Sequence, residues 1–278
     1  MSFRIVVDSC CEMTAQMKKD PHFVKVPLTI RVGKNTFVDD MSFDQEDLLQ
    51  AMKQSENAPS TSCPSPQNYL DAISCGAEDV YVVTLSALLS GSHNSAHQAK
   101  MMMEEDNPEI NVHVFNSCSA VCGETAIALK IKELAESGMP FKKVVREVDK
   151  FIYRMKTLFV LENLENLRKN GRLTRMQAIV TGALKIKLLC HATPEGEIGK
   201  VGQALTVKQA LTKLVEKAAE DADHEGRLAI ISHCNCPQRA LEVKEMLEKK
   251  CKFREIQITG AGGITTVYAD DGGIVVAY

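Results

Sequence analysis

In the first half of the chain, short runs of apolar and β-branched residues alternate with longer segments of helical periodicity. The runs typical of strands are 4–7, 79–85 and 111–115. The segments with a helical pattern are 44–53, 67–74, 92–105, 120–138 and 141–154. This alternation predicts an α/β domain with a mostly parallel sheet. A further run, 24–32, meets 35–38 across Gly33-Lys34, which predicts a hairpin at a sheet edge, where Pro27 limits the pairing.

After residue 155 the pattern changes, because hairpins join the strands and helices. Strands are predicted at 158–160, 228–232 and 255–259. One helix is predicted to end at Asn170-Gly171, and three more are predicted at 174–181, 206–222 and 237–249. One hairpin is predicted from 185–190 through a turn at 194–197, and a closing one through 270–273. We therefore expect two domains, an α/β domain at 1–155 and an α+β domain at 156–278.

Composition and charge narrow the class of protein. Of the 278 residues, 45% are hydrophobic and 25% are charged, which is typical of a soluble globular protein. The formal net charge of -3 argues against a nucleic-acid-binding protein. No apolar run approaches the ~20 residues needed to span a bilayer. The first residues lack the features of a secretion signal, so we expect a cytoplasmic protein whose ten cysteines are thiols.

Polar residues gather where strands end or helices begin in the first domain. The clusters are Asp8-Ser9, 60–62, 86–94 and 116–119. In a parallel sheet such positions share the carboxyl edge, where helix N-termini present N–H groups to ligands, although Ser and Thr also cap helices without any ligand. The segments 60–66, 86–99 and 116–128 contain no Lys or Arg, which a phosphate usually recruits. The pattern therefore favours a singly charged anion such as a carboxylate.

Motifs for other chemistries are weak or missing. The sequence has no P-loop, no complete G-x-G-x-x-G, no H-E-x-x-H and no G-x-S-x-G. His93 lies beside a Ser-Gly-Ser turn and is a candidate base, but no carboxylate that would orient it is recognisable. His233-Cys-Asn-Cys236 offers three metal ligands where a full zinc site needs about four, so we expect no metal.

Several motifs together resemble the DegV family of bacterial fatty-acid-binding proteins. The first half carries Asp8-Ser9 after a strand, Thr-Ser-Cys-Pro-Ser-Pro at 61–66 and Leu-Ser-Gly-Ser at 89–92. Asn116-Ser117 stands where the family has Asp-Ser, 164–172 is similar to its Leu-x-x-Leu-x-x-x-Gly-Arg element, and 184–187 is similar to its Leu-Asn-Ile-Lys-Pro strand. The order and spacing of these motifs cover nearly the whole chain.

The resemblance implies a protein that encloses one long-chain fatty acid, such as palmitate, in a tunnel between two domains. It implies no catalysis and no cofactor, but a carrier that presents the fatty acid to a separate fatty acid kinase. By their place in the motifs, Thr61 and Ser90 are the expected carboxylate hydroxyls, and Arg172 is the expected contact for the kinase. The other implied carboxylate-binding residues are Ser62, Gly91 and Ser92, with Ser9, Ser117 and Asp270 as neighbours of the head group.

The closing segment departs from the family. The family has Ala-His-x-Gly-Pro-Gly there, whereas this chain has Ala269-Asp-Asp-Gly-Gly273, without the histidine and the proline. A carboxyl group of Asp270 or Asp271 beside a fatty-acid carboxylate would raise the pKa of one of the two. We therefore expect either that the loop turns away or that the head-group environment differs from that of the family.

Two other functions stay open. One is an acyl or phosphoryl transferase that uses the serine-rich edge with His93 or His113 as its base. The other is a thiol or metal sensor at His233, Cys234 and Cys236.

Overall fold

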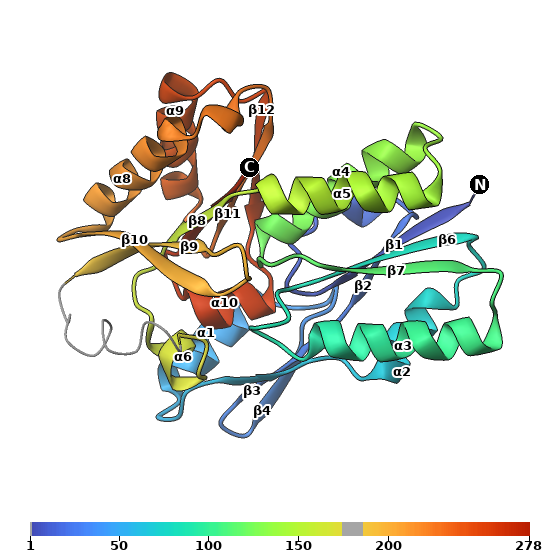
Figure 1. Ribbon diagram of the computed structural model, residues 1–278. Helices are drawn as coiled ribbons and strands as arrows, with labels where there is room; N and C mark the ends of the chain where they lie inside the picture. The colour runs from blue at the N-terminus through green and yellow to red at the C-terminus, as the bar shows by residue number, and fades with distance from the viewer. Residues whose placement is uncertain (1, 174–185) are drawn as a thin grey trace.

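The computed structural model describes residues 2–173 and 186–278, which form two lobes, each built around a sheet (Figure 1). The first lobe has a four-stranded parallel sheet with the order β2-β1-β6-β7. Its strands are β1 (Phe3–Asp8), β2 (Phe23–Val26), β6 (Asp79–Thr84) and β7 (Asn111–Asn116). Its helices are α2 (Pro66–Ile73) and α3 (Ser92–Asp106) on one face and α4 (Cys122–Glu136) and α5 (Phe141–Arg154) on the other (Figure 1). The predicted α/β fold with a parallel sheet is thus confirmed.

Local sequence explains where these elements begin and which face they bury. All side chains of β6 are buried, since helices cover both faces of the sheet. The helix α2 begins at a capping box between Ser65 and Asn68, with Pro66 in its first turn. The helix α5 buries Val144 and Val148, which lie one turn apart on the same face.

The second lobe has a six-stranded sheet with the order β10-β9-β8-β13-β11-β12, in which only β11 and β12 pair in parallel. Its strands are β8 (Thr157–Val160), β9 (Lys187–Ala192), β10 (Ile198–Ala204), β11 (Leu228–His233), β12 (Glu255–Gly260) and β13 (Ile274–Ala277). The helices α8 (Val207–Glu220) and α9 (Pro237–Lys250) cover one face of this sheet. The short helix α6 (Glu165–Lys169) ends near the predicted Asn170-Gly171, while the helix predicted at 174–181 lies outside the described residues.

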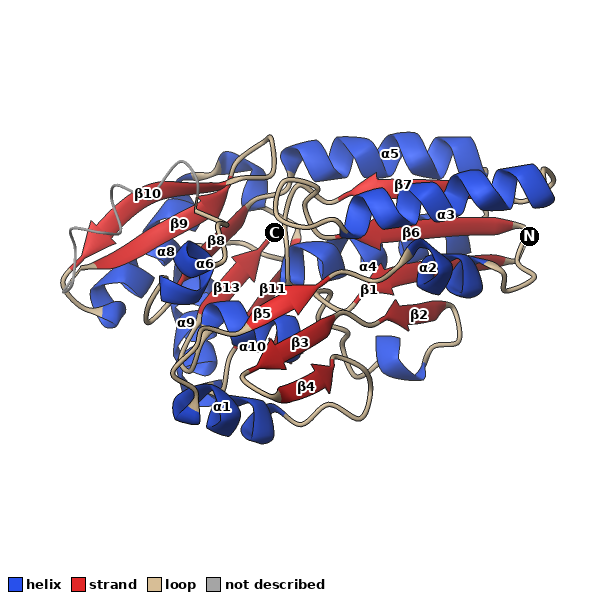
Figure 2. Ribbon diagram, turned by 90° about the horizontal axis from the view of Figure 1, so that it is seen from below, coloured by secondary structure: helices blue, strands red, loops and turns tan. Residues whose placement is uncertain are grey.

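A separate three-stranded antiparallel sheet corrects one prediction. Its strands are β3 (Thr29–Val32), β4 (Asn35–Val38) and β5 (Ser60–Ser62), in the order β4-β3-β5. The predicted run 24–32 is not one strand, because the chain breaks at Pro27 and Leu28: β2 joins the parallel sheet, and only β3 and β4 form the hairpin. The cluster 60–62 therefore lies on a strand of this small sheet and not at the carboxyl edge of the parallel one (Figure 2).

The prediction of a closing hairpin through 270–273 is wrong. Residues before the turn form the helix α10 (Gly263–Ala269), and β13 then enters the middle of the second sheet, between β8 and β11. The helix α1 (Gln45–Gln54) contacts α10, so a short helix of the second half packs beside elements of the first (Figures 1 and 2). Single-turn 3-10 helices occur at Met17–Lys19 and Ala222–His224.

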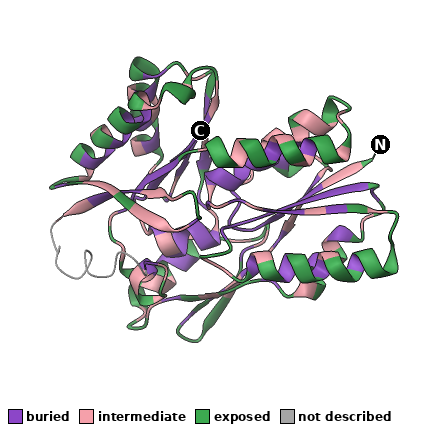
Figure 3. Cartoon of the chain, in the orientation of Figure 1, coloured by how far each residue is buried: buried purple, intermediate pink, exposed green. Residues whose placement is uncertain are grey.

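The two lobes share buried contacts. The chain passes from α5 to β8 at 155–156, and α4 contacts β11 and β13 as well as β1 and β6. Figure 3 shows buried strands in both lobes and a buried α10 between them. The domain boundary at 155 stays a prediction. Among the described residues, no helix has both the length and the apolar character that crossing a bilayer requires.

Candidate functional site

An apolar cavity lies where the two lobes and α10 meet. The space between its walls is about 850 Å³ when the open solvent at its mouth is counted. Most of the lining is apolar: Cys10, Leu28, Leu85, Leu89, Ala120, Val121, Phe159, Leu161, Leu167, Ala192, Ile198, Ile264, Ala269 and Val275. The polar lining residues are Thr61, Ser90, Ser119, Thr157, Arg172, Glu197, Thr265 and Tyr268. An apolar ligand with a small polar head suits such a lining.

Thr61 reaches the cavity from β5. Alternation along this strand leaves Ser60 and Ser62 exposed, while Thr61 is half-buried and lines the cavity. Thr61 Oγ1 lies 2.7 Å from Tyr268 Oη on α10, so the two hydroxyl groups share a hydrogen bond. The sequence did not point to Tyr268, because nothing in it connects this residue to a threonine 207 residues away.

Ser90 lies in the tight loop between β6 and α3. The backbone N–H groups of Leu89 and Ser90 both donate to Ser86 O, at 2.9 and 3.1 Å. Ser90 Oγ accepts from the N–H of Ser92 at 3.2 Å, next to the start of α3. The hydrogen bonds of the described residues leave the Ser90 hydroxyl proton available to a ligand in the cavity.

Arg172 brings to the cavity a positive charge that the sequence clusters lack. Its Nε donates to Leu89 O at 3.2 Å and its Nη1 donates to Asn170 O, while its Cζ lies 5.8 Å from the ring centroid of Tyr268. The guanidinium group therefore lies beside the segments that carry Thr61, Tyr268 and Ser90. The absence of Lys and Arg from the polar clusters of the sequence favoured a singly charged anion. That reasoning is incomplete, because Arg172 reaches the cavity from a segment distant in sequence.

The segment 164–172 connects three parts of the chain around the cavity. The contacts are Asn166 Nδ2 to Val267 O (2.8 Å), Asn170 Nδ2 to Pro59 O (2.9 Å) and Arg172 Nε to Leu89 O (3.2 Å). They reach α10, the start of β5 and the loop before α3. Gly171, with a φ of 74°, provides the left-handed turn that ends α6 and directs Arg172 back to the cavity.

Several other residues expected at the head group lie outside the cavity lining. Three serine hydroxyls are buried and bonded elsewhere: Ser9 Oγ accepts from Leu28 N (3.0 Å), Ser117 Oγ donates to Ser119 O (3.0 Å), and Ser92 Oγ donates to Asp8 Oδ2 (2.7 Å). Gly91 is exposed at the N-cap of α3, and Ser62 is exposed on β5. The structure thus brings Thr61, Ser90 and Arg172 together at one cavity and places the others around it.

Asp270 points to a different partner. It ends α10 with a φ of 56°, and its Oδ2 accepts from Asn163 Nδ2 while its Oδ1 accepts from the N–H of Asp271 at 2.9 Å. Asp271 lies 3.7 Å from Lys53. Neither acid lines the cavity, so the geometry corresponds to the first of the two expectations, a loop that turns away.

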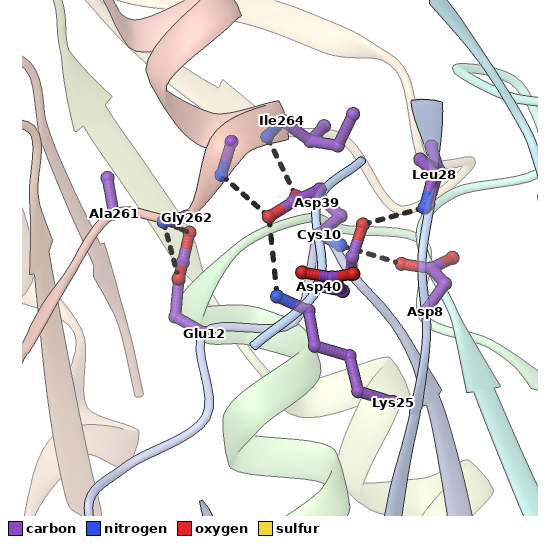
Figure 4. Close-up of polar contacts among 12 residues, drawn as sticks. Asp8, Cys10, Glu12, Lys25, Leu28, Asp39, Asp40, Ala261, Gly262 and Ile264 are labelled. Carbon is purple, nitrogen blue, oxygen red and sulfur yellow. Dashed lines mark hydrogen bonds and ion pairs between the residues drawn. The ribbon is translucent and has the colours of Figure 1, made fainter. Parts of the chain in front are cut away.

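Two buried carboxylates from the first half of the chain cap the start of α10 (Figure 4). Both oxygens of Glu12 accept from the N–H of Gly262 at 2.8 Å. Asp39 accepts from the N–H groups of Gly263 and Ile264 at 2.8 and 2.9 Å, and lies 3.3 Å from Lys25 Nζ. These contacts satisfy backbone donors that a buried helix start would leave unpaired, and they fix the helix that carries Tyr268.

Burial makes Glu12 a source of pH-dependent stability. Desolvation raises the pKa of Glu12 from 4.5 to about 7, with hydrogen bonds to its carboxylate opposing the shift. Between pH 4.5 and 7 the folded protein therefore binds more protons than the unfolded chain, so stability falls as pH rises. We expect Glu12→Gln to reduce this fall by on the order of 1 kcal/mol per pH unit, measured by urea denaturation across the window. Part of the dependence of stability on pH should persist in the variant, because burial also raises the pKa of Asp8 and of Glu124. If the free energy of unfolding of the variant fell with pH as steeply as that of the wild type, the assignment to Glu12 would be contradicted.

A serine–histidine pair does not form among residues 2–173 and 186–278. His93 Nδ1 lies 3.2 Å from Thr84 Oγ1, while the hydroxyl of Ser92 faces Asp8 and Tyr69. Burial lowers the pKa of His93 and lowers that of His113 to about 4. The geometry of the described residues therefore gives the transferase hypothesis no base beside a serine nucleophile.

The described residues also contain no group of three His, Cys, Asp or Glu side chains placed to hold a metal ion. Cys234 is buried, with its Sγ 3.7 Å from Thr266 Oγ1, whereas His233 Nδ1 accepts from the N–H of Cys236 at 3.3 Å. Burial raises the pKa of the Cys234 thiol to about 12, which disfavours the reactive thiolate.

Comparison with known proteins decides the family. The family model described as "Uncharacterised protein, DegV family" matches residues 2–278. The chain belongs to the DegV family. A DegV domain-containing protein of Streptococcus pyogenes serotype M1 is 33% identical over 280 residues, covering 100% of this chain and 99% of that protein.

Solved DegV structures match the whole fold. A DegV protein from Ruminococcus gnavus, refined with vaccenic acid, is 44% identical, with a TM-score of 0.95 over 100% of both chains. The Fatty Acid Kinase (Fak) B3 protein of Streptococcus pneumoniae, loaded with linoleic acid, is 31% identical, with a TM-score of 0.91 over 100% of this chain and 99% of that one. The family resemblance seen in the motifs is thereby confirmed.

Proposed function

We propose that this DegV protein binds one long-chain fatty acid, with the acyl chain in the cavity and the carboxylate at the hydroxyls of Thr61 and Ser90. The observation that carries the proposal is the mainly apolar lining of the cavity, whose polar residues include these two hydroxyls and the guanidinium of Arg172. The whole-chain match to DegV proteins solved with vaccenic and linoleic acid supports it.

The acyl chain supplies most of the affinity. Burying about 14 methylene groups at roughly 0.8 kcal/mol each gives on the order of 11 kcal/mol as an upper bound. A hydrogen bond to a charged group contributes about 1.5 to 3 kcal/mol, so Thr61 and Ser90 chiefly set the direction in which the fatty acid lies.

The protein acts as a carrier without catalysis of its own, and it presents the carboxylate to a separate fatty acid kinase. The likeness to the pneumococcal kinase B3 protein supports this role. Arg172 is the contact for the kinase, because it lines both the cavity and an open groove beside His93 and His97. From that groove a partner reaches the head group without entering the apolar part of the cavity.

The proposal predicts that Thr61→Val discriminates between an acid and its ester. Valine keeps the shape of threonine but cannot donate, so palmitate should bind about tenfold or more weakly, while methyl palmitate should be nearly unaffected. Isothermal titration calorimetry with delipidated protein measures both ligands. The control is Thr212→Val, a half-buried threonine on α8 that lies outside the cavity lining and whose hydroxyl bonds within the helix. Equal losses for acid and ester would contradict a carboxylate role for Thr61, and wild-type protein that binds no palmitate would refute the function itself.

A further inference from the structure

A pair of buried hydroxyl groups lines the cavity apart from the head-group residues. Ser119 lies in the loop between β7 and α4, and Thr157 begins β8. Both residues line the cavity, and they are only 2% and 5% exposed. Ser119 Oγ lies 2.7 Å from Thr157 Oγ1, so the two side chains share a hydrogen bond. A chain of methylene groups has no hydrogen-bonding atom, so the binding of a simple fatty acid makes no use of this pair.

The place of Thr157 on β8 puts the pair away from the carboxylate. Thr157, Phe159 and Leu161 alternate along the chain and line the cavity, whereas Leu158 and Val160 pack into the core on the other face of the sheet. Successive members of this row lie about 7 Å apart. After Leu161 the chain forms α6 and returns to the head-group end of the cavity. The hydroxyl pair therefore faces a part of the acyl chain that is remote from its carboxylate.

The hydrogen bond within the pair leaves Thr157 able to bind a further hydroxyl group. A hydroxyl has one donor hydrogen and two acceptor lone pairs. Ser119 Oγ also lies 3.5 Å from Ala120 O, whereas Ser119 is the one hydrogen-bond partner of Thr157 Oγ1 among the described residues. If Ser119 donates to Thr157, the hydrogen of Thr157 is unused. If Thr157 donates to Ser119, both lone pairs of Thr157 are unused.

The packing around the pair makes the cavity its open side. A Cβ built at Gly123, in the first turn of α4, would lie 2.2 Å from Ser119 Oγ and 3.1 Å from Thr157 Oγ1. The backbone of α4 therefore closes one side of the pair and leaves no room there for a side chain. Because both hydroxyl-bearing residues line the cavity, a ligand inside it can reach the unused capacity of Thr157.

An oxygen atom on the acyl chain gives this capacity a use. A hydroxyl that enters an apolar cavity loses its hydrogen bonds to water, and this loss opposes binding unless a protein group replaces them. Thr157 can accept from such a hydroxyl or donate to it, and Ser119 holds the Thr157 side chain in position.

Building on the proposed function, we infer that Thr157, held by Ser119, is a specificity-determining residue that binds a hydroxyl group on the part of the acyl chain remote from the carboxylate. The ligands of this protein therefore include long-chain hydroxy fatty acids as well as unsubstituted ones.

The test is Thr157→Val, which keeps the branched shape of the side chain and removes its hydroxyl. Delipidated protein is titrated calorimetrically with stearate and with monohydroxystearates whose hydroxyl lies at successive carbons from the middle of the chain to its methyl end. In the wild type, we expect at least one isomer to bind within about threefold of stearate, because its hydroxyl finds a partner. In Thr157→Val, the affinity of that isomer relative to stearate should fall about tenfold or more, because its hydroxyl is then buried without a partner.

Further variants and a further ligand separate contact with the ligand from a structural role. Thr157→Ser retains the hydroxyl and should keep the wild-type ratio of the two affinities. The matched control is Thr259→Val, since Thr259 is 6% exposed on β12 of the same sheet, lies outside the cavity lining, and has its Oγ1 3.5 Å from Ile231 O. A hydroxystearate with its hydroxyl next to the carboxylate should keep its affinity relative to stearate in Thr157→Val. Thermal unfolding establishes that each variant is folded, and Thr157→Ala, which also lacks the hydroxyl, is titrated if Thr157→Val is not.

The outcomes separate the inference from the proposed function. If the wild type fails to bind stearate, the function itself fails. If the wild type binds stearate but every isomer of the series binds more than about tenfold more weakly, the cavity has no partner for a hydroxyl and the inference is overturned. Equal losses for stearate and for the hydroxystearates in Thr157→Val would also overturn it, while fatty-acid binding stands.

Discussion

Asp39→Ala is expected to lower the free energy of unfolding by about 3–5 kcal/mol, because it leaves Lys25 without the partner of a buried ion pair. The Asp39 side chain is fully buried, and that of Lys25 is 15% exposed. The substitution also removes the acceptor for the N–H groups of Gly263 and Ile264 at the start of α10. Palmitate binding should fall with stability, because α10 carries Tyr268. Urea denaturation and calorimetric titration measure the two effects.

Asp44→Ala is the matched control. Asp44 also accepts two backbone N–H groups, from Glu46 at 2.8 Å and Asp47 at 3.1 Å, but its cap of α1 is exposed to solvent. Loss of an exposed cap costs about 1 kcal/mol. If both variants lost the same stability, burial and the ion pair with Lys25 would not be what makes Asp39 important.

Gly196→Ala is expected to cost about 2–4 kcal/mol, the sum of a left-handed backbone and a steric overlap. Gly196 has a φ of 90° at the tip of the β9–β10 hairpin, and a Cβ built there would lie 2.4 Å from Ser86 Oγ and 3.0 Å from Cys118 Cα. The tip is held by the Ser86 hydroxyl, which donates to Gly196 O at 2.6 Å. Since Gly196 and Ile198 line the cavity, displacement of the tip should also speed the release of bound palmitate, measured by stopped-flow transfer to albumin.

Gly226→Ala is the control that separates the cost of the left-handed backbone from the cost of steric overlap. Gly226 has a φ of 75°, but a Cβ there meets nothing within 4 Å. This variant should show only the backbone cost of about 1–2 kcal/mol and no change in palmitate release. A Gly196→Ala variant that was no worse than Gly226→Ala, in stability and in release rate, would show that the hairpin tip does not close the cavity.

The first lobe could be predicted from local sequence, because its strands and helices follow the pattern that burial imposes. The ends of β1, β6 and β7 bring Asp8, Thr84 and Asn116 to one sheet edge, as the α/β pattern implies. The segment before 270 could not be predicted in this way. Ile264, Thr265, Thr266 and Val267 are β-branched and favour a strand, yet they form a helix, since distant acids cap its start and its side chains are buried.

The candidate site, too, could be predicted only in part from local sequence. The motifs pointed to Thr61, Ser90 and Arg172, and all three line the cavity. Serine-rich clusters alone did not separate these from Ser9 and Ser92, whose hydroxyls are used inside the first lobe. The contacts of Glu12 and Asp39 span 250 and 224 residues, and no local pattern identifies partners at such a distance.

The arrangement around α10 bears on how the polypeptide matures during translation. Glu12 and Asp39 are made early, whereas Gly262 and Gly263 at the start of α10 follow 250 and 224 residues later, and the central strand β13 comes after them. Until then, Glu12 and Asp39 lack the N–H groups from which they accept in the folded protein, and the sheet of the second lobe lacks its middle strand. The start of α10 and the sheet of the second lobe therefore form only after both halves of the chain have been made, which lengthens the time in which chaperones can engage it.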